Sequence, residues 1–201
     1  MRYSICQSRL DYPMKNKFRK KYVAKRNELS PNQIEEFSLE IANRLLQLPI
    51  WELEYYHLFL NITEKKEVET EFILHILQGK DKNIILSKSD FNTRKLYNFL
   101  LTDTTVIRKN KWNIPEPIDG IEIPSEKIDV VFVPLLAFDL NGHRLGYGKG
   151  FYDIFLASCK PDVIKVGVSF FEAENIIPEL EISDIPLDYC VTPKKTYIFK
   201  K

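Results

Sequence analysis

The feature that most constrains the fold is an apolar segment in the second half of the chain. Residues 127–138 read KIDVVFVPLLAF and concentrate β-branched and aromatic side chains. The run is far shorter than the roughly 20 residues that a membrane-spanning helix needs. A short run of this composition is typical of a buried strand, so the rest of the chain has to supply neighbouring strands and covering helices.

Predicted helices and short strands alternate around this segment. Helical spacing of apolar residues or helix-compatible composition marks residues 14–29, 31–48, 70–80 and 151–159. Short apolar or aromatic runs mark strands at 55–62, 83–87, 95–101, 163–170, 189–193 and 196–200. The alternation predicts an α/β fold with three layers, in which a mostly parallel, twisted, Rossmann-like sheet is flanked by helices. No repeat or linker interrupts it, so we expect a single domain over residues 1–201.

One helix start is marked in detail. Ser30 is followed by Pro31 and, three residues after the serine, by Gln33, which is the pattern of a capping box with proline at the first helical position. Pro49 is expected to stop this helix. Its apolar residues fall at spacings of three and four and form one stripe: Ile34, Phe37, Ile41, Leu45 and Leu48.

Charge and cysteine content limit the environment and the partners. The chain has 29 basic and 28 acidic residues, so no bulk field draws it to nucleic acid or to a membrane. Residues 1–17 lack the apolar core of a signal peptide. The cysteines Cys6, Cys159 and Cys190 are odd in number and far apart, which favours core thiols in a reducing compartment. We therefore expect a cytoplasmic protein.

The segment 142–153, GHRLGYGKGFYD, holds four of the seven glycines of the chain. It is not a Walker loop, because position 143 is histidine and Lys149 is followed by glycine. It also fails the dinucleotide pattern, which would require glycine at Phe151 or at Asp153. A nicotinamide cofactor is therefore not supported.

Two interpretations of this glycine segment remain open from the residues. Glycines 146, 148 and 150 can turn backbone N–H groups toward an anion, with Arg144, Lys149 and the start of a helix near Phe151 adding positive potential. Asp153 could then hold magnesium beside phosphates. Alternatively, the segment is a hairpin turn at Asn141-Gly142, and Asp153 only complements the helix dipole.

A longer stretch around the glycine segment resembles a family signature. Residues 132–153, FVPLLAFDLNGHRLGYGKGFYD, are similar to the motif of the 5-formyltetrahydrofolate cyclo-ligases. Three further segments agree with that family in the same order: KNKFR at 15–19, EVET at 67–70 and WNIPEP at 112–117. The resemblance extends from residue 15 to about residue 192. It implies the cyclo-ligase fold and an enzyme that closes 5-formyltetrahydrofolate to 5,10-methenyltetrahydrofolate while ATP becomes ADP and phosphate.

The resemblance implies a set of nucleotide and metal residues. Lys149, Arg144 and Tyr152 would be catalytic, with Lys149 on the transferring phosphate. Magnesium would lie on Asp153 and Asp184, although Asp188 is close enough in sequence to compete for the second position. ATP would contact Lys15, Arg19, Arg144, Leu145, Gly146, Tyr147, Gly148, Lys149, Gly150, Phe151 and Tyr152.

The resemblance also implies a folate side, where a carboxylate can accept adjacent N–H donors of a pterin ring. Without it, Glu67 reads as a carboxylate at a helix start near Thr70, and Trp112 as an ordinary core aromatic. Tyr147 stands where some members have arginine, which removes a charge and adds an aromatic face. The implied folate contacts are Leu60, Glu67, Trp112, Tyr147, Gly148, Lys149, Gly150 and Phe151.

Other classes of function receive less support from the residues. Neither a nucleophile elbow nor a zinc spacing occurs, and His57 fits a structural role in a strand, while His143 could be a bystander or a ligand contact. A non-catalytic folate or nucleotide-binding module with the same fold stays an alternative. An RNA-binding role would use the basic helix at 14–29, whose Lys17, Lys20, Lys21, Lys25 and Arg26 we expect to be mostly solvated. We expect small-molecule partners, no nucleic acid or membrane, and a monomer.

Overall fold

The computed structural model describes residues 13–199, which form a central seven-stranded sheet. The five inner strands run parallel to one another, whereas the two edge strands, β11 and β3, pair antiparallel. This confirms the mostly parallel α/β sheet. In spatial order the strands are β11 (Thr196–Ile198), β10 (Tyr189–Val191), β9 (Ile164–Val168), β6 (Val130–Pro134), β1 (Tyr55–His57), β2 (Asn83–Asp90) and β3 (Lys95–Leu100).

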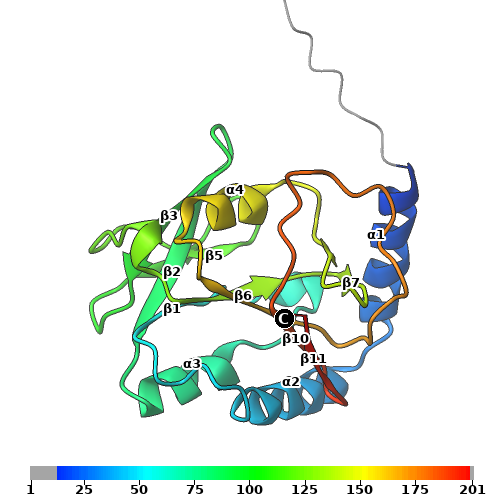
Figure 1. The fold of residues 1–201 in the computed structure, drawn as a ribbon. Helices are drawn as coiled ribbons and strands as arrows, with labels where there is room; N and C mark the ends of the chain where they lie inside the picture. Colours follow the sequence, from blue (N-terminus) through cyan, green and yellow to red (C-terminus); the bar gives the residue numbers. More distant parts are fainter. Residues whose placement is uncertain (1–12, 200–201) are drawn as a thin grey trace, which may run out of the picture.

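Helices cover both faces of the sheet, which gives the three layers (Figure 1). On one face lie α2 (Pro31–Leu45) and α3 (Glu71–Gly79), and on the other lies α4 (Phe151–Ser158). Along β6, Val130 and Phe132 join the core beneath α2 and α3, whereas Val131 and Val133 join the core beneath α4. The apolar run is unbroken because successive side chains enter different cores.

The remaining elements lie outside the central sheet. Helix α1 (Pro13–Asn27) packs beside the short strand β7 at one end of the molecule (Figure 1). Two antiparallel pairs complete the strands, and two 3-10 turns complete the helices: β4 (Ile107–Lys109) with β5 (Pro115–Pro117), β7 (Ala137–Phe138) with β8 (Arg144–Leu145), η1 (Thr63–Lys65) and η2 (Ser125–Lys127).

Two predicted strands end early, and one hairpin was not predicted. The strand expected at 55–62 ends at His57, because the chain then turns into the loop that carries η1. The strand expected at 127–138 ends at Pro134, which has no N–H for a ladder hydrogen bond, and residues 137–138 pair with a different strand. The hairpin of β4 and β5 was not predicted, because its first strand is exposed at all three residues and carries no apolar pattern.

The predicted capping box is confirmed. The Ser30 hydroxyl oxygen accepts from the Gln33 N–H at 3.2 Å, and the Gln33 side chain accepts from the Ser30 N–H at 2.9 Å. The helix ends at Leu45, before Pro49, and the Trp51 indole donates to the Leu45 carbonyl at 3.0 Å. That bond satisfies one of the carbonyls that a helix end leaves free.

Two of the three cysteines lie in the described part of the chain. Cys190 is fully buried and Cys159 is partly buried, and both are free thiols, while Cys6 lies outside the described residues. Between residues 13 and 199, no helix has both the length and the apolar character to cross a membrane.

The strand order identifies the edge of the sheet at which a ligand should bind. The crossover from β1 through α3 leads to β2, and the crossover from β6 through α4 leads in the opposite direction to β9. Loops that follow the carboxyl ends of two such diverging strands leave a crevice where ligands bind in α/β sheets. Here those loops are residues 58–70 after β1 and 135–150 after β6.

A buried histidine of β1 begins a row of hydrogen bonds that runs across the neighbouring strands β2 and β3. His57 Nε2 lies 2.7 Å from Ser87 Oγ, and that hydroxyl donates to Asn98 Oδ1 at 2.7 Å. Because the serine proton is already used, His57 Nε2 must be the donor. Burial lowers the pKa of His57 to about 3, so the folded protein keeps this ring neutral well below its usual range. The structural role expected for His57 fits this environment.

This histidine predicts an acid-sensitive contribution to stability. In the unfolded chain His57 gains a proton near pH 6.5, whereas the folded chain does not protonate it until about pH 3. Between those values its contribution to the free energy of unfolding falls by about 1.4 kcal/mol for each unit that the pH drops. Urea unfolding across this range should therefore show a shallower pH slope for His57→Gln than for the natural protein. Equal slopes would contradict the assignment.

Candidate active site

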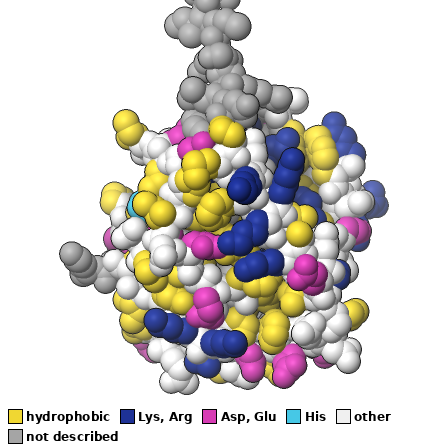
Figure 2. All heavy atoms as spheres, turned by 90° about the vertical axis from the view of Figure 1, so that its right-hand side faces the viewer, with side chains coloured by type: hydrophobic (Ala, Val, Ile, Leu, Met, Phe, Trp, Pro, Cys, Tyr) yellow, Lys and Arg dark blue, Asp and Glu magenta, His cyan; other side chains and the backbone are white. Residues whose placement is uncertain are grey.

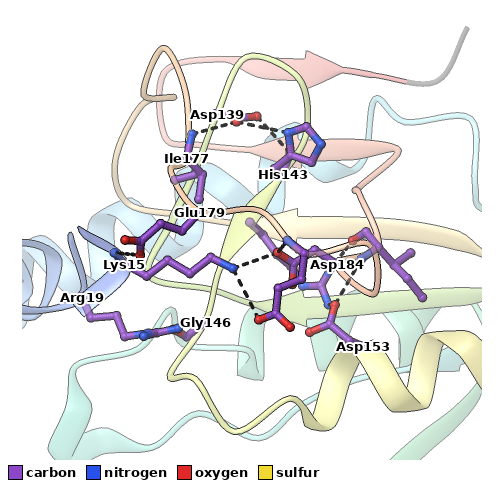
Figure 3. A network of polar contacts seen from close by, with 12 residues as sticks. Lys15, Arg19, Asp139, His143, Gly146, Asp153, Ile177, Glu179 and Asp184 are labelled. Carbon is purple, nitrogen blue, oxygen red and sulfur yellow. Dashed lines mark hydrogen bonds and ion pairs between the residues drawn. The ribbon is translucent and has the colours of Figure 1, made fainter. Parts of the chain in front are cut away.

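The glycine segment forms a hairpin that leads into a glycine loop. A hairpin forms first, with Ala137 paired to Leu145 and Phe138 to Arg144. The fully buried Asp139 carboxylate accepts from three backbone N–H groups at 2.9–3.0 Å, those of Asn141, His143 and Ile177, and Figure 3 shows Asp139 with the last two. The His143 ring nitrogen Nδ1 lies 3.2 Å from the same carboxylate. The expected hairpin is confirmed, and the glycine loop 146–150 follows it.

The glycine loop ends at the start of a helix, as expected. Helix α4 begins at Phe151, and its N-cap is Gly150, which has φ 73° and no side chain to cap the first N–H groups. Those N–H groups carry the positive end of the helix dipole. Lys149 is exposed beside them and makes no hydrogen bond or ion pair with residues 13–199. This end of the loop therefore offers positive potential to an anion.

Helix α1 brings one predicted basic side chain to the glycine loop and the other to Asp184. Arg19 Nε donates to the Gly146 carbonyl at 3.1 Å, and its guanidinium lies against Gly148. Lys15, one turn earlier, is only 4% exposed, and its Nζ lies 2.9 Å from Asp184 Oδ2 (Figure 3). These contacts join residues far apart in the sequence: Arg19 and Gly146 are 127 positions apart, and Lys15 and Asp184 are 169 positions apart.

Gly148 provides a test of this contact. Its φ is 81°, and a Cβ there would lie 2.9 Å from Arg19 Cζ, so Gly148→Ala both strains the backbone and displaces the guanidinium. For the ATP that the family resemblance implies, we expect the Michaelis constant to rise about 10-fold, because a charge-assisted contact to phosphate is weakened. Steady-state kinetics with ATP as the varied substrate measures this.

Two neighbouring glycines give matched controls for this substitution. Gly150 also has a positive φ, 73°, but a Cβ there meets nothing within 4 Å, so Gly150→Ala isolates the backbone strain. Gly146→Ala introduces neither a close contact nor an unfavourable φ. If all three variants raise the Michaelis constant equally, the contact with Arg19 is not the cause.

Asp153 and Asp184 lie near each other beside the loop (Figure 3), and Arg144 pairs with Asp153. The Arg144 guanidinium donates to Asp153 Oδ1 at 2.6 Å and also to the Ile185 carbonyl, while the Ile185 N–H donates to Asp153 Oδ1 at 3.2 Å. Asp184 therefore precedes a residue that contacts Asp153 directly. The competing Asp188 instead pairs with Lys165 at 2.8 Å.

Each predicted metal ligand pairs with a cation. Asp153 pairs with Arg144, and Asp184 pairs with Lys15. Within residues 13–199, no three histidine, cysteine or acidic side chains are grouped so that they could hold a metal. A magnesium ion needs only one or two carboxylates when phosphates supply further oxygens, so these two aspartates fit that kind of site.

Glu67 is buried, with 4% of its surface exposed, in the loop after β1. Its Oε2 accepts from the Ile62 N–H at 2.8 Å, and its Oε1 accepts from the Tyr147 hydroxyl at 2.6 Å. The Tyr147 oxygen in turn accepts from Arg26 at 2.9 Å. The view of Glu67 as a carboxylate at a helix start is wrong, because its bonds connect the two loops of the crevice.

The contact with Arg26 was missed from the sequence. This residue was expected to be mostly solvated, but only 4% of it is exposed, because it packs beneath the loop after β6. Burial, followed by the nearby Glu67 carboxylate, raises the pKa of Tyr147, so its hydroxyl keeps its proton. Tyr152 shows the same direction, with burial first and Glu67 second.

Aromatic rings extend from the start of α4. Trp112 stacks on Phe91 with ring centroids 3.5 Å apart, and Phe91 meets the edge of Phe151 at 5.0 Å. Trp112 is 42% exposed, so the view of it as a core aromatic is wrong. Leu60 is partly buried in the loop after β1 and packs against the core beneath α2 and α3. Both residues have surface that a ligand could contact.

The amino-acid sequence that forms this site matches a known protein family. The model of the 5-formyltetrahydrofolate cyclo-ligase family matches residues 11–193. The chain belongs to this family. It is therefore an enzyme with the cyclo-ligase activity of the family, as the sequence resemblance implied.

Relatives of this cyclo-ligase cover nearly the whole chain. It is 30% identical over 200 residues to a probable 5-formyltetrahydrofolate cyclo-ligase of Schizosaccharomyces pombe, covering 90% of this chain and 96% of the relative. It is 27% identical over 179 residues to the Escherichia coli K12 cyclo-ligase, covering 86% and 97%. The Aquifex aeolicus 5,10-methenyltetrahydrofolate synthetase superimposes with a TM-score of 0.80 at 30% identity, covering 94% of each chain.

Proposed function

We propose that this cyclo-ligase converts 5-formyltetrahydrofolate to 5,10-methenyltetrahydrofolate with ATP as co-substrate, releasing ADP and phosphate. The observation that carries the proposal is the position of the glycine loop. One side of it contacts Arg19 of α1, and Tyr147 within it contacts the buried Glu67. A nucleotide and a folate bound on these two sides would meet at a single loop.

The nucleotide side is suited to phosphates. The N-terminal end of α4, Lys149 and Arg19 of α1 meet at residues 146–150, and Lys15 of the same helix pairs with Asp184. Phosphoryl transfer depends mainly on positioning and on neutralising the charge that develops on the phosphoryl oxygens. We assign Lys149 to the transferring phosphate, while Arg144 and Tyr152 act beside it, since Arg144 anchors the start of α4 through Asp153.

Magnesium would be held by Asp153 and Asp184. These carboxylates are hard oxygen ligands, and each has one oxygen, Asp153 Oδ2 and Asp184 Oδ1, that makes no hydrogen bond or ion pair with residues 13–199. The ion would neutralise phosphate charge when bound. Arg144 holds the Asp153 carboxylate in place, and Lys15 holds that of Asp184. Each carboxylate would then bind its basic partner and the ion at the same time.

The folate side is suited to a pterin ring and to the reacting formyl group. Glu67 can accept adjacent N–H donors of the ring, and Trp112, Leu60 and Phe151 can border it. A formyl amide is a poor electrophile, and its oxygen leaves with difficulty. Transfer of the terminal phosphoryl group of ATP to that oxygen makes it a leaving group, after which N10 attacks the formyl carbon and phosphate departs. This chemistry requires positioned charges more than a nucleophile of the protein.

The partners that we propose are small molecules, for a monomer in the cytoplasm. Figure 2 shows the face at the α1 end, where Lys and Arg side chains are mixed with Asp and Glu. Lys21, for example, pairs with Glu174. An extended nucleic-acid surface would need a more continuous basic stripe, and the net charge is only +1.

One assay tests the proposed function. Purified protein is mixed with magnesium, ATP and 5-formyltetrahydrofolate, and the near-ultraviolet absorbance of the methenyl product is followed with time. We expect absorbance that grows only when ATP is present. A non-catalytic binding module would bind both ligands in equilibrium titrations and yet form no product, and that result would overturn the proposal.

A further inference from the structure

Arg26 is a buried guanidinium that the proposed chemistry does not use. It donates one hydrogen bond to the Tyr147 hydroxyl at 2.9 Å and another to the Leu135 carbonyl. Its Nε is buried and has no hydrogen-bond partner among residues 13–199. A guanidinium that served only to hold the fold together would be expected to have its buried donors satisfied. Arg26 instead leaves one buried donor, its Nε, without a partner in the described range, and its guanidinium bonds to Tyr147 of the glycine loop, which joins the two sides of the site.

The directions of the hydrogen bonds that connect Arg26, Tyr147 and Glu67 follow from the chemistry of the three side chains. Arginine only donates, and an ionised carboxylate only accepts, so Tyr147 must accept from Arg26 and donate to Glu67. Lys65 Nζ lies over the Tyr147 ring, 4.2 Å from its centroid, and restrains the ring from one side. Tyr147 is therefore held at its hydroxyl and at its face, with its proton directed at Glu67.

The same bonds leave Glu67 able to bind a ligand. Each of its oxygens accepts one hydrogen bond from the protein, Oε1 from Tyr147 and Oε2 from Ile62. A carboxylate has about four lone-pair positions, so each oxygen can accept another donor. A pair of adjacent N–H groups on a ligand would fit these remaining positions only if the plane of the carboxylate were fixed.

We propose that Arg26 is a positioning residue for the folate side of the site, which acts through Tyr147 to fix the orientation of the Glu67 carboxylate. The proposal rests on the proposed function, since it assigns Glu67 to the folate ring. It also gives α1 two tasks, because Arg19 of the same helix contacts the nucleotide side of the loop. Removing Arg26 should then affect folate binding without affecting ATP binding.

The first test compares two arginine variants. Arg26→Met removes the donor, and Arg44→Met is the matched control, because Arg44 donates to the Pro193 carbonyl at 2.6 Å from α2, away from the glycine loop. We expect Arg26→Met to raise the Michaelis constant for the folate about 10-fold and to leave that for ATP within about twofold. Arg44→Met should change neither. Unchanged folate kinetics, or equal increases for both substrates, would overturn the proposal.

A second test asks whether Arg26 acts through Tyr147. In the Tyr147→Phe background the hydroxyl bridge is absent, so Arg26→Met should add less than about a twofold further change. An undiminished effect of Arg26→Met in that background would show that Tyr147 is not the route. Thermal melting reports whether Arg26→Met folds; if it does not, Arg26→Lys, which keeps the charge but loses the forked geometry, takes its place in both tests.

Equilibrium binding separates this proposal from the proposed function. Quenching of protein fluorescence by 5-formyltetrahydrofolate, without ATP, gives a dissociation constant that needs no turnover. If the natural protein binds the folate but forms no product, the proposed function fails, and Arg26→Met is still expected to weaken binding about 10-fold. If Arg26→Met binds the folate as tightly as the natural protein does, the positioning role is wrong whatever the activity.

Discussion

Lys149→Ala is expected to lower kcat by about 100- to 1,000-fold, because one charge aimed at the transferring phosphate is lost. The side chain is exposed at the start of α4 and bonds to no residue in the described range, so its removal should leave the melting temperature unchanged. A large loss of activity without a loss of stability is the pattern of a group that acts mainly in the transition state. Product absorbance at saturating ATP and folate measures kcat, and thermal unfolding measures stability.

A matched lysine gives the control for this prediction. Lys20 is exposed on α1, and Lys20→Ala removes the same charge from the protein without touching the loop. We expect it to retain full kcat, and we expect Lys149→Arg, which keeps the charge, to retain more activity than Lys149→Ala. Full activity in Lys149→Ala would remove Lys149 from the proposed chemistry.

The parts of the fold that could be predicted are those with a local cause. Ser30 and Gln33 form their capping box within four consecutive residues, and the start of α4 follows directly from Gly150. The apolar run around β6 showed a buried strand because the four consecutive residues from Val130 to Val133 all enter a core. Each of these signals depends only on neighbours in the sequence.

The boundaries and contacts that were missed depend on residues far away in the sequence. In α1, Lys15, Tyr22 and Arg26 are the buried positions, and their spacing of seven and four places them on one face. A helix rich in lysine gives no apolar stripe there, so a solvated Arg26 was the natural expectation. The partners that hold it are Leu135 and Tyr147, 109 and 121 positions later in the chain.

The acidic residues at the loop show a similar limit. Their chemical type was enough to suggest Asp153 and Asp184 as metal ligands, but their pairing with Arg144 and Lys15 is a tertiary contact. This pairing implies that the two carboxylates are already charge-compensated before an ion arrives. Metal binding at this site would therefore have to displace or share cations, rather than fill an empty acidic cluster.

Glu67→Gln is expected to raise the Michaelis constant and the dissociation constant for the folate about 100-fold, because two charge-assisted hydrogen bonds become neutral ones and a donor replaces an acceptor. The substitution keeps the volume of this buried side chain, so a change in packing is not the cause. Glu116→Gln is the matched control, since Glu116 is also a buried glutamate that accepts from a backbone N–H, that of Ser89 at 3.1 Å. Steady-state kinetics should show ATP binding within about twofold of the natural value in both variants. If Glu67→Gln bound the folate normally, or if it weakened the binding of ATP and of the folate equally, the Glu67 carboxylate would have a structural role in the loop and would not bind the pterin ring.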